Sequence, residues 1–493
     1  EILIGLVGSE MCIRDRSVMA EGGINAALNT KGEEDSPEQH YTDTLTAACG
    51  LADPNAVWGM TQAASELVRS LHHLGVQFNV TDDDELDLRN FGGQKKKRTA
   101  FAQSDTGKQL MTALIDAVRR EESAGTVERF PHHKFRTLLL SGNICGGCTV
   151  QDTYTGELLR FVCDAVLIAT GGLHGLFGDT TGSLANTGEV TAELFRLGVP
   201  MANLEMIQYH PTTVELGEKR MLLSEAARGE GGRLFALRNG KPWYFMEEKY
   251  PELGNLMPRD ITAREVWTVS RDYEVFLDMT ELPKEVMEHK LAGLVDDCQT
   301  YLHKDIRKEP IPILPGIHYF MGGIQVDERH RTSMRNLYAA GECCAQYHGA
   351  NRLGGNSLLG AIYGGQIAAE TACRETVSSP NMPCAEESLL PELSPDAQMQ
   401  MNRILLNALG VVRDAQTLEA GIQEIRKLSG TLPLLGCAML ESALARKESR
   451  GAHWRADYPQ RNDAVYCKTT VAHWNGQHIA ISFESIPERR HDL

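Results

Sequence analysis

Two apolar segments that end directly in glycine constrain the fold of this chain more than any other feature. AVLIATGG covers residues 165–172, and NLYAAGE covers residues 336–342. A continuously apolar strand is typical of a parallel sheet covered on both faces, and a glycine turn at its carboxyl end lets backbone approach a nucleotide closely. Each of the two junctions has the shape that is common where backbone meets a nucleotide.

Apolar residues at helical spacing predict long helices that face the core. One face of residues 56–74 is apolar at positions 57, 60, 64, 67, 68 and 71, and residues 106–119 repeat the pattern. Composition and period predict the remaining elements: a strand-rich stretch at 134–169, helices at 187–198 and 357–372, and a helical region at 396–447.

Composition excludes several classes of protein. The 493 residues suffice for two or three domains, and no apolar run approaches the roughly 18 residues that span a bilayer. The net charge of −17 argues against a nucleic-acid partner, because phosphate binding requires a basic face. The one basic run, QKKKR at 94–98, is interpreted as a solvated loop, with nucleic-acid contact as the alternative.

The twelve cysteines follow no regular framework, which predicts a reducing compartment. Cys145-Gly146-Gly147-Cys148 is interpreted as a tight turn between strands at 136–141 and 148–152, with a redox or metal role as the alternative. A single CxxC supplies two ligands, whereas a structural zinc site needs four, so no metal site is predicted.

Four loop-like stretches carry the candidate functional residues. QYHPTT (208–213), MPRDITAR (257–264), GIHYFMGG (316–323) and HGANRLGGNSLLG (348–360) surround His210, Arg259, His318 and Arg352 with Gly, Pro or Asn. Arginine pairs a carboxylate at two points with its planar fork. If the four stretches converge, they form a pocket for a small molecule with at least two negative charges.

The motifs, taken in order, resemble one family. AEGGINAAL (20–28), RNFGGQKKKRTAFAQSDTG (89–107), VLIATGG, HPTT, LLSEAARGEGG (222–232), PRD, HYFMGG, AAGE and GANRLGGNSLLG follow the order of the fumarate reductase and succinate dehydrogenase flavoproteins. ALARKESRGAHWRADYP (443–459) is similar to the same family. The resemblance extends from Ser17 to about residue 460.

The resemblance implies an α/β fold with three parts. An FAD-binding domain would comprise 17–221 and 316–380, a capping domain would occupy 222–315, and a linker at 381–395 would lead to a helical C-terminal domain at 396–493. Residues 1–16 fit this pattern poorly and are interpreted as a non-native segment. The G-x-G-x-x-G fingerprint of the first βαβ unit is absent from the sequence, so that unit is predicted to be missing or replaced. The stretch from Arg16 to Met19 also lacks the histidine that bonds FAD covalently in many members, which predicts non-covalent FAD.

The resemblance also implies the roles of the site residues. Arg259 matches the proton donor, and Glu225 and Arg228 match the relay that returns its proton; the alternative for Arg259 is a surface salt bridge with Asp260. The positions that grip the substrate carboxylates are matched by His210, Ser224, His318 and Arg352. The positions that line FAD are matched by Gly22, Gly23, Thr170, Gly171, Glu342, Ser357 and Leu358. Phe91, Gly92 and Gly93 form either a turn beside a core aromatic residue or a wall of the substrate site.

The implied activity is the interconversion of fumarate and succinate, and the implied partner is an iron-sulfur subunit that carries electrons. No C-x-x-C-x-x-C run is present, so electrons come from another protein. The expected location is the cytoplasm, with peripheral attachment to the inner membrane through partner subunits. Two alternatives stay open: an L-aspartate oxidase, and a non-catalytic or truncated scaffold that holds no stable FAD.

Overall fold

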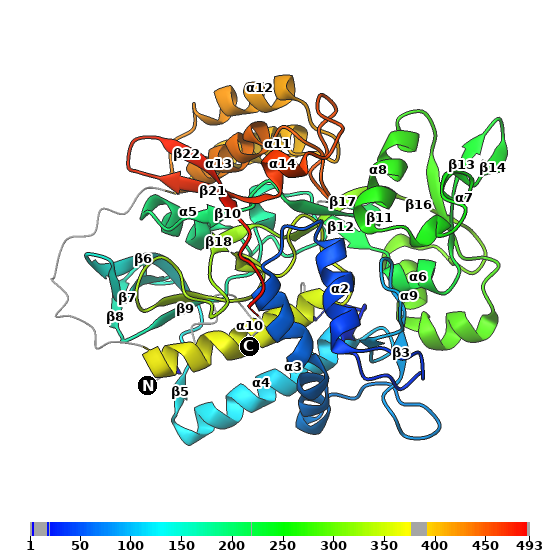
Figure 1. The fold of residues 1–493 in the computed structure, drawn as a ribbon, viewed down its shortest axis with the longest axis horizontal. Helices are drawn as coiled ribbons and strands as arrows, with labels where there is room; N and C mark the ends of the chain where they lie inside the picture. Colours follow the sequence, from blue (N-terminus) through cyan, green and yellow to red (C-terminus); the bar gives the residue numbers. More distant parts are fainter. Residues whose placement is uncertain (1, 4–16, 19, 218, 376–391, 491–493) are drawn as a thin grey trace.

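The computed structural model describes residues 2–3, 17–18, 20–217, 219–375 and 392–490. Within these residues the apolar side chains gather in three large clusters. One cluster joins the central strands to the C-terminal helices, a second lies in the part built from about 214 to 313, and a third lies among the N-terminal helices. The second cluster corresponds to the predicted cap, and the other two lie in the predicted FAD-binding domain, the first of them shared with the C-terminal part (Figure 1). The domain boundaries given above stay predictions.

Three helices of the N-terminal third lie along the lower part of Figure 1: α2 (Pro37–Ala47), α3 (Pro54–Leu74) and α4 (Thr106–Ala124). Helix α3 begins where the Asp53 side chain accepts hydrogen bonds from the amides of Asn55 and Ala56, and it ends at Gly75, whose φ is 117°. Both devices satisfy backbone groups that a helix end leaves unpaired. The predicted helices at 56–74 and 106–119 are therefore confirmed, the second with one further turn.

The two strand-to-glycine junctions lie side by side. Strand β9 (Val166–Ile168) pairs in parallel with β19 (Leu337–Ala339), in the register Val166 to Leu337. Parallel neighbours end at the same edge of a sheet, so the glycine turns after both strands face the same space. Helix α10 (Asn356–Glu375) follows β19 and packs against α3. The predicted dinucleotide-type core is confirmed at these strands.

The three-stranded sheet β6–β7–β8 corrects one prediction. Strand β6 (His133–Ser141) turns at Gly142 and Asn143 into β7 (Ile144–Asp152), which then pairs with β8 (Leu158–Val162). The predicted turn at Cys145–Cys148 is wrong, because all four residues lie inside β7 at a register shift. Gly147 is required there: its φ is 144°, and a Cβ would lie 1.9 Å from the carbonyl oxygen of Phe161 on β8.

The cap is a separate layer at the right of Figure 1. Its antiparallel sheet has the order β14–β13–β15–β16, built from β13 (Arg233–Arg238), β14 (Lys241–Trp243), β15 (Val275–Asp278) and β16 (Ile311–Pro312). Helices α6 (Glu225–Gly229), α7 (Phe245–Lys249), α8 (Arg259–Ser270) and α9 (Ala292–Asp297) surround the sheet. The first residues of α6 and α8 point back toward the FAD-binding domain, where β11 (Ile207–Leu216) pairs with β17 (Leu314–Phe320).

The C-terminal part begins with helices α11 (Pro395–Ala408), α12 (Ala415–Ile425) and α13 (Thr431–Ala445), as predicted for 396–447. The sequence did not predict the two strands that follow, β21 (Lys468–Trp474) and β22 (Ile479–Ser485). Strand β21 joins the FAD-binding domain by pairing with β10 (Met201–Ala202) in the five-stranded sheet β20–β18–β10–β21–β22. The sequence of a short C-terminal segment does not indicate the strand with which that segment pairs when this strand is far away along the chain.

Buried ion pairs lock the C-terminal part onto the central sheet. Arg446 is fully buried and donates to Glu205 at 2.7 Å and to Glu448 at 2.9 Å. Glu205 also accepts from the hydroxyl of Thr470 on β21, at 2.6 Å. Buried charges that satisfy one another in this way tie the two parts together in one register.

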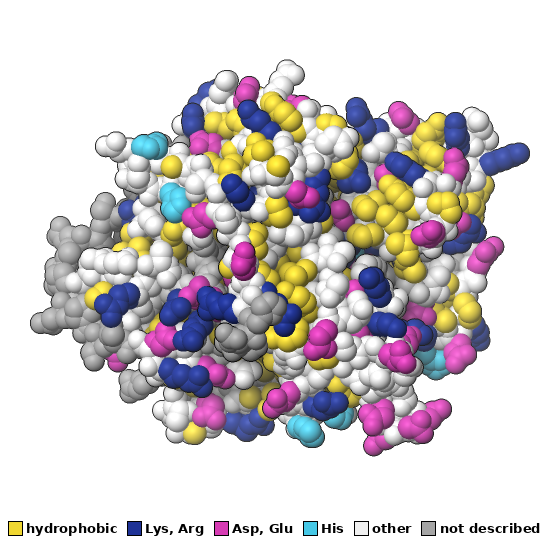
Figure 2. All heavy atoms as spheres, in the orientation of Figure 1, with side chains coloured by type: hydrophobic (Ala, Val, Ile, Leu, Met, Phe, Trp, Pro, Cys, Tyr) yellow, Lys and Arg dark blue, Asp and Glu magenta, His cyan; other side chains and the backbone are white. Residues whose placement is uncertain are grey.

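The basic run at 94–98 is only in part a solvated loop. Lys95 and Lys97 are exposed, but Arg98 is fully buried and contacts Asp35 at 2.9 Å and Asp43 at 2.8 Å. Acidic and basic side chains alternate over the face drawn in Figure 2, with no broad basic area in view. This arrangement does not favour the alternative of nucleic-acid contact.

At the N-terminus, strand β1 (Ile2–Leu3) pairs in parallel with β5 (Val127–Glu128). The predictions about a non-native segment, a replaced first βαβ unit and the missing covalent histidine fall mainly on residues 4–16 and 19, which lie outside the described residues. Among the described residues, no helix combines the length and the apolar character that crossing a bilayer requires.

Candidate active site

A buried triad of two arginines and one glutamate forms the centre of the site. Arg259, the first residue of α8, donates through Nε at 2.8 Å and through NH2 at 2.5 Å to Oε2 of Glu225. Arg228 lies one turn along α6, with NH2 3.4 Å from Oε1 of the same carboxylate. The predicted Arg259, Glu225 and Arg228 therefore contact one another, and the alternative pairing of Arg259 with Asp260 is wrong.

The charges of this triad depend on one another. Burial by itself would raise the pKa of Glu225, but the two guanidinium groups outweigh it and hold that pKa below its usual value. Burial, together with Arg259, lowers the pKa of Arg228. A carboxylate that stays ionised between two arginines can accept a proton from one and return it to the other.

Two histidines face each other across β11 and β17. The ring centroids of His210 and His318 are 5.2 Å apart, because Tyr209 and His210 on β11 pair with Ile317 and Gly316 on β17. Burial, with the guanidinium groups of Arg259 and Arg228 nearby, holds the pKa of His210 well below its usual value. His210 is therefore neutral at physiological pH, and among the described residues its Nε2 has no hydrogen-bond partner.

The remaining predicted substrate residues lie around the same space. The Arg352 guanidinium carbon lies 4.5 Å from the ring centroid of Tyr319, and its charge lowers the pKa values of both His210 and Glu225. The Ser224 hydroxyl accepts from the amide of Ala226 at 3.3 Å and caps α6. The four loop-like stretches thus converge, which is the condition that the pocket for a diacid requires.

Glu21 is a titratable neighbour of this site that the sequence did not single out. Its carboxyl is buried and is held by a hydrogen bond with the Ser224 side chain. Burial raises the pKa of Glu21 to about 8, and the carboxylates of Asp297 and Asp105 add to the rise, while the hydrogen bond with Ser224 and the charge of Arg89 lower the pKa. The side chain of Ser224 is therefore next to a carboxyl group that is protonated at neutral pH.

Gly92 and Phe91 fit both alternatives left open by the sequence. Phe91 belongs to the apolar core of the cap, whereas the amide of Gly92 donates to Oε1 of Glu225 at 3.2 Å. The segment is therefore a turn that packs on the cap and also contacts the triad.

Of the residues predicted to line FAD, Thr170, Gly171 and Glu342 lie at the common edge of β9 and β19. Glu342 follows β19, and its Oε1 accepts from the amide of Phe320 at 2.9 Å. A Cβ at Gly172 would lie 2.6 Å from that same oxygen, so the Thr170-Gly171-Gly172 turn contacts Glu342 directly. Leu167 on β9 is 42% exposed, although both faces of a parallel strand are normally covered.

The start of α10 completes this cradle. Ser357 and Leu358 are partly exposed, whereas the residues from 351 to 356 are buried. Asn356, the first residue of α10, is held by Asn25 at 2.7 Å, by His40 at 2.9 Å and by Thr44 at 3.0 Å. A helix N-terminus fixed in this way offers amides to an anionic or polar group.

Gly22 and Gly23 border the same network from the other side. A Cβ at Gly22 would lie 3.3 Å from the Phe91 ring, and Gly23 has a φ of 119° beside the carbonyl of Ala100. An uncovered apolar strand, a glycine turn beside a carboxylate and a helix start held from behind together fit FAD. The seven predicted residues would hold it, with Ser357 and Leu358 at the helix start.

Local sequence reasoning missed the polar side chains that orient these groups. Gln208 accepts from NH1 of Arg259 at 3.2 Å and donates to Oδ1 of Asn351 at 2.8 Å. Gln94 donates to Asn25 at 2.9 Å, which supports the start of α10. The only available signal was their position inside the motifs, next to the residues that were singled out.

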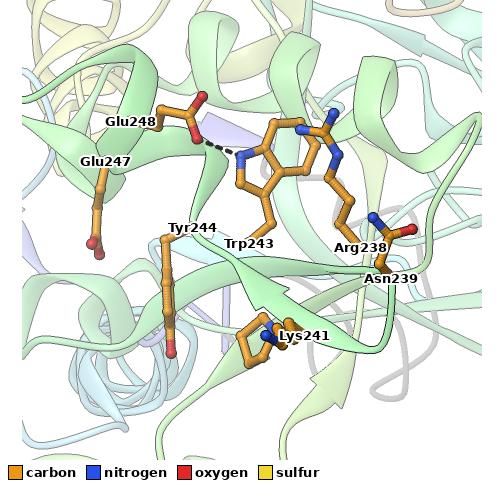
Figure 3. A pocket seen from close by; sticks show the side chains of 8 residues that line it. Arg238, Asn239, Lys241, Trp243, Tyr244, Glu247 and Glu248 are labelled. Carbon is orange, nitrogen blue, oxygen red and sulfur yellow. Dashed lines mark hydrogen bonds between the residues drawn. The ribbon is translucent and has the colours of Figure 1, made fainter.

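A surface hollow of about 600 Å³ lies apart from this site, on the outer hairpin of the cap. Figure 3 shows its lining, where the Trp243 indole donates to Glu248 at 2.7 Å and Arg238 lies over the indole. It contains none of the predicted site residues. Within the described segments, no three His, Cys, Asp or Glu side chains are grouped as metal ligands would be.

Comparison with known proteins agrees with this geometry. Residues 7–358 match the family model described as an FAD binding domain, and residues 429–490 match the model described as the fumarate reductase flavoprotein C-terminus. The succinate dehydrogenase flavoprotein subunit of Bacillus subtilis is 38% identical over 96% of this chain and 90% of its own length. The chain belongs to the fumarate reductase and succinate dehydrogenase flavoprotein family.

The chain is also similar to a solved fumarate reductase and to a related oxidase. The structure of E. coli quinol fumarate reductase superimposes with a TM-score of 0.87 at 26% identity, covering 98% of this chain and 92% of that one. L-aspartate oxidase of Streptomyces coelicolor is 31% identical over 95% of this chain and 87% of its own length. The FAD-dependent oxidoreductase class and the three-part fold predicted from the sequence are thereby confirmed, and FAD is the cofactor of this flavoprotein.

Proposed function

We propose that this flavoprotein interconverts fumarate and succinate, with Arg259 as the group that exchanges a proton with the dicarboxylate. The observation that carries the proposal is the buried triad, in which Arg259 and Arg228 share the carboxylate of Glu225. FAD, when bound, supplies the hydride chemistry of the reaction through its N5. The side chains of the chain bind and polarise the diacid and move the proton.

Each group has a defined part in fumarate reduction. Arg352 and His318 bind one carboxylate while neutral His210 and Ser224 donate to the other, which polarises the alkene. Arg259 gives a proton to the alkene carbon that receives no hydride. A free arginine is too basic for this task, so Glu225 restores the proton at once by passing it from Arg228. In succinate oxidation the same proton travels in the opposite direction.

Substitution of Arg259 tests the proposal. Arg259→Gln should abolish fumarate reduction by a reduced dye, while FAD content and the binding of malonate, a non-reacting diacid, stay close to wild type. Arg264→Gln is the matched control, because Arg264 lies on the same helix and stacks on Trp454 at 3.9 Å, away from the triad. Substantial fumarate reduction by Arg259→Gln would reject the assignment.

Two rival functions are separated by direct assays. Peroxide and iminoaspartate formed from L-aspartate and oxygen would identify an L-aspartate oxidase; the greater likeness to succinate dehydrogenase, 38% against 31% identity, supports the dicarboxylate reaction. A purified protein that lacks flavin absorption would identify a non-catalytic scaffold.

We further propose that an iron-sulfur subunit exchanges electrons with this flavoprotein and attaches it to the cytoplasmic face of the inner membrane. The support is that several relatives are named as flavoprotein subunits. Expression together with its neighbouring subunits, followed by assay in both directions with a quinone analogue, tests the partner and the direction.

A further inference from the structure

A closed ring of hydrogen bonds begins and ends on two consecutive residues of α8. Arg259 NH1 donates to Oε1 of Gln208 at 3.2 Å, and Gln208 Nε2 donates to Oδ1 of Asn351 at 2.8 Å. Asn351 Nδ2 then donates to Oδ1 of Asp260 at 3.0 Å, on the residue that follows Arg259. The cap thus supplies both ends of the ring, and the FAD-binding domain supplies the two amides between them.

All three bonds point the same way, from Arg259 toward Asp260. This direction determines the orientation of both amides, because a flipped Asn351 would set its NH2 group against the NH2 group of Gln208. The second amide hydrogen of Gln208 donates to the carbonyl oxygen of Arg352 at 3.0 Å, which supports the same orientation. Hydrogen bonds arranged head to tail polarise one another, so the carboxylate of Asp260 strengthens the bond that Gln208 accepts from Arg259.

The ring also decides which hydrogens of Arg259 face the substrate. A guanidinium group has five N–H donors in one plane. Nε and NH2 are engaged with Glu225 and NH1 with Gln208, so the plane is held at two separate edges and cannot rotate. The remaining hydrogens, one each on NH1 and NH2, are left to point away from these partners.

We propose that Asn351 is a positioning residue for proton transfer: it orients Gln208, and thereby aligns Arg259 with the bound diacid. The proposal rests on the proposed function of Arg259. Asn351 contacts a cap residue and a residue of β11 at the same time, so it links the position of the cap to the orientation of the proton donor. It does not itself move the proton.

Asn351→Asp is the sharpest test, because the substitution keeps the shape and replaces the donor with an acceptor. The new carboxylate would face Asp260 and oppose it, and we expect kcat for fumarate reduction to fall by about tenfold or more. The loss should grow as pH rises, since protonation of either carboxyl restores a donor. KM for fumarate, the Kd of malonate and FAD content should stay within about twofold of wild type, as for a group that acts on the transition state alone.

The double variant Asn351→Asp with Asp260→Asn supplies the rescue. The amide introduced at position 260 would donate to the carboxylate introduced at position 351, which still accepts from Gln208. The orientation of Gln208 is thereby restored, and kcat should recover most of its value. Asp260→Asn alone keeps an acceptor for Asn351 but removes the charge that polarises the ring, so it should lose less kcat than Asn351→Asp. If Asn351→Asp fails to retain FAD, Asn351→Ala is measured in its place. We expect the same loss of kcat for this variant, with an unchanged Kd for malonate.

Several results would overturn the inference: a wild-type kcat in the variants of Asn351, a loss confined to KM, or a loss that Asp260→Asn does not repair. These results are distinct from failure of the proposed function. That failure would appear as a wild-type protein that holds FAD and binds malonate but does not reduce fumarate.

Discussion

Replacing Glu21 by glutamine should make the stability of this flavoprotein less dependent on pH. Glu21 is buried, and this burial, with the negative charges of Asp297 and Asp105, raises its pKa from 4.5 to about 8. A carboxyl whose pKa is raised by folding contributes stability in full below about pH 4.5, and that contribution is lost as pH rises toward about 8. Each pH unit in this interval removes at most about 1.4 kcal/mol, so the wild type loses up to about 5 kcal/mol across it.

The assay is thermal unfolding of the FAD-loaded protein, followed by release of flavin fluorescence, at about pH 6 and about pH 8. Over these two pH units the wild type should lose up to about 3 kcal/mol relative to Glu21→Gln, since the neutral amide has no charge to bury. Glu66→Gln is the control, because Glu66 is exposed on α3. A difference between Glu21→Gln and wild type that is the same at both pH values would refute the reasoning.

The same substitution should alter substrate binding. A hydroxyl has one hydrogen to donate, and the oxygen of Ser224 already accepts from the amide of Ala226. Above about pH 8 the Glu21 carboxylate would attract the Ser224 hydrogen away from the diacid, so the KM of the wild type for fumarate should rise there. Glutamine donates to Ser224 at every pH, and the KM of Glu21→Gln should stay flat; a parallel rise in both proteins would contradict the mechanism.

Two further predictions concern stability. Gly147→Ala should destabilise the protein by more than about 3 kcal/mol, because the new Cβ would lie 1.9 Å from a carbonyl oxygen of β8. Gly142→Ala is the control: Gly142 has a φ of 59° and open space around it, so the substitution should cost only about 1 kcal/mol. Equal unfolding midpoints of the two variants in urea would contradict the assignment of the CxxC to a strand. Arg446→Met should cost about 3 kcal/mol, because Glu205 stays buried without its ion-pair partner, whereas Glu448 keeps its pair with Arg450. Calorimetry measures that loss, and a midpoint close to that of the wild type would show that the ion pairs do not tie the C-terminal part to the sheet.

The elements predicted correctly are those that local chemistry decides. Helix α3 has a continuous apolar face, a capping aspartate before Pro54 and a glycine after Leu74, all within one segment. The apolar runs at 165–172 and 336–342 identified β9 and β19 for the same reason. The prediction of a turn at the CGGC segment was wrong because two glycines are as compatible with two strands in close contact as with a turn. Only the neighbouring Phe161 of β8 distinguishes the two structures.

The residues of the active site were likewise predicted only in part. Arg259, Glu225, Arg228, His210 and His318 were predicted because their motifs occur in a known order, and the structure brings them together. The groups that orient them were not predicted. Asn and Gln side chains follow no distinctive pattern in the local sequence, and their role depends on which atoms lie within about 3 Å of them in the folded chain.

By itself the sequence determined the amphipathic helices and the strand-to-glycine junctions, because each depends on spacing within one segment, and the order of its motifs singled out the charged residues proposed to bind a diacid. Only the tertiary structure decided the pairing of β21 with β10, the burial that protonates Glu21, and the ring from Arg259 through Gln208 and Asn351 to Asp260. Burial and hydrogen-bond direction depend on neighbours that are hundreds of residues away along the chain, so their effect on charge and orientation exists only after folding.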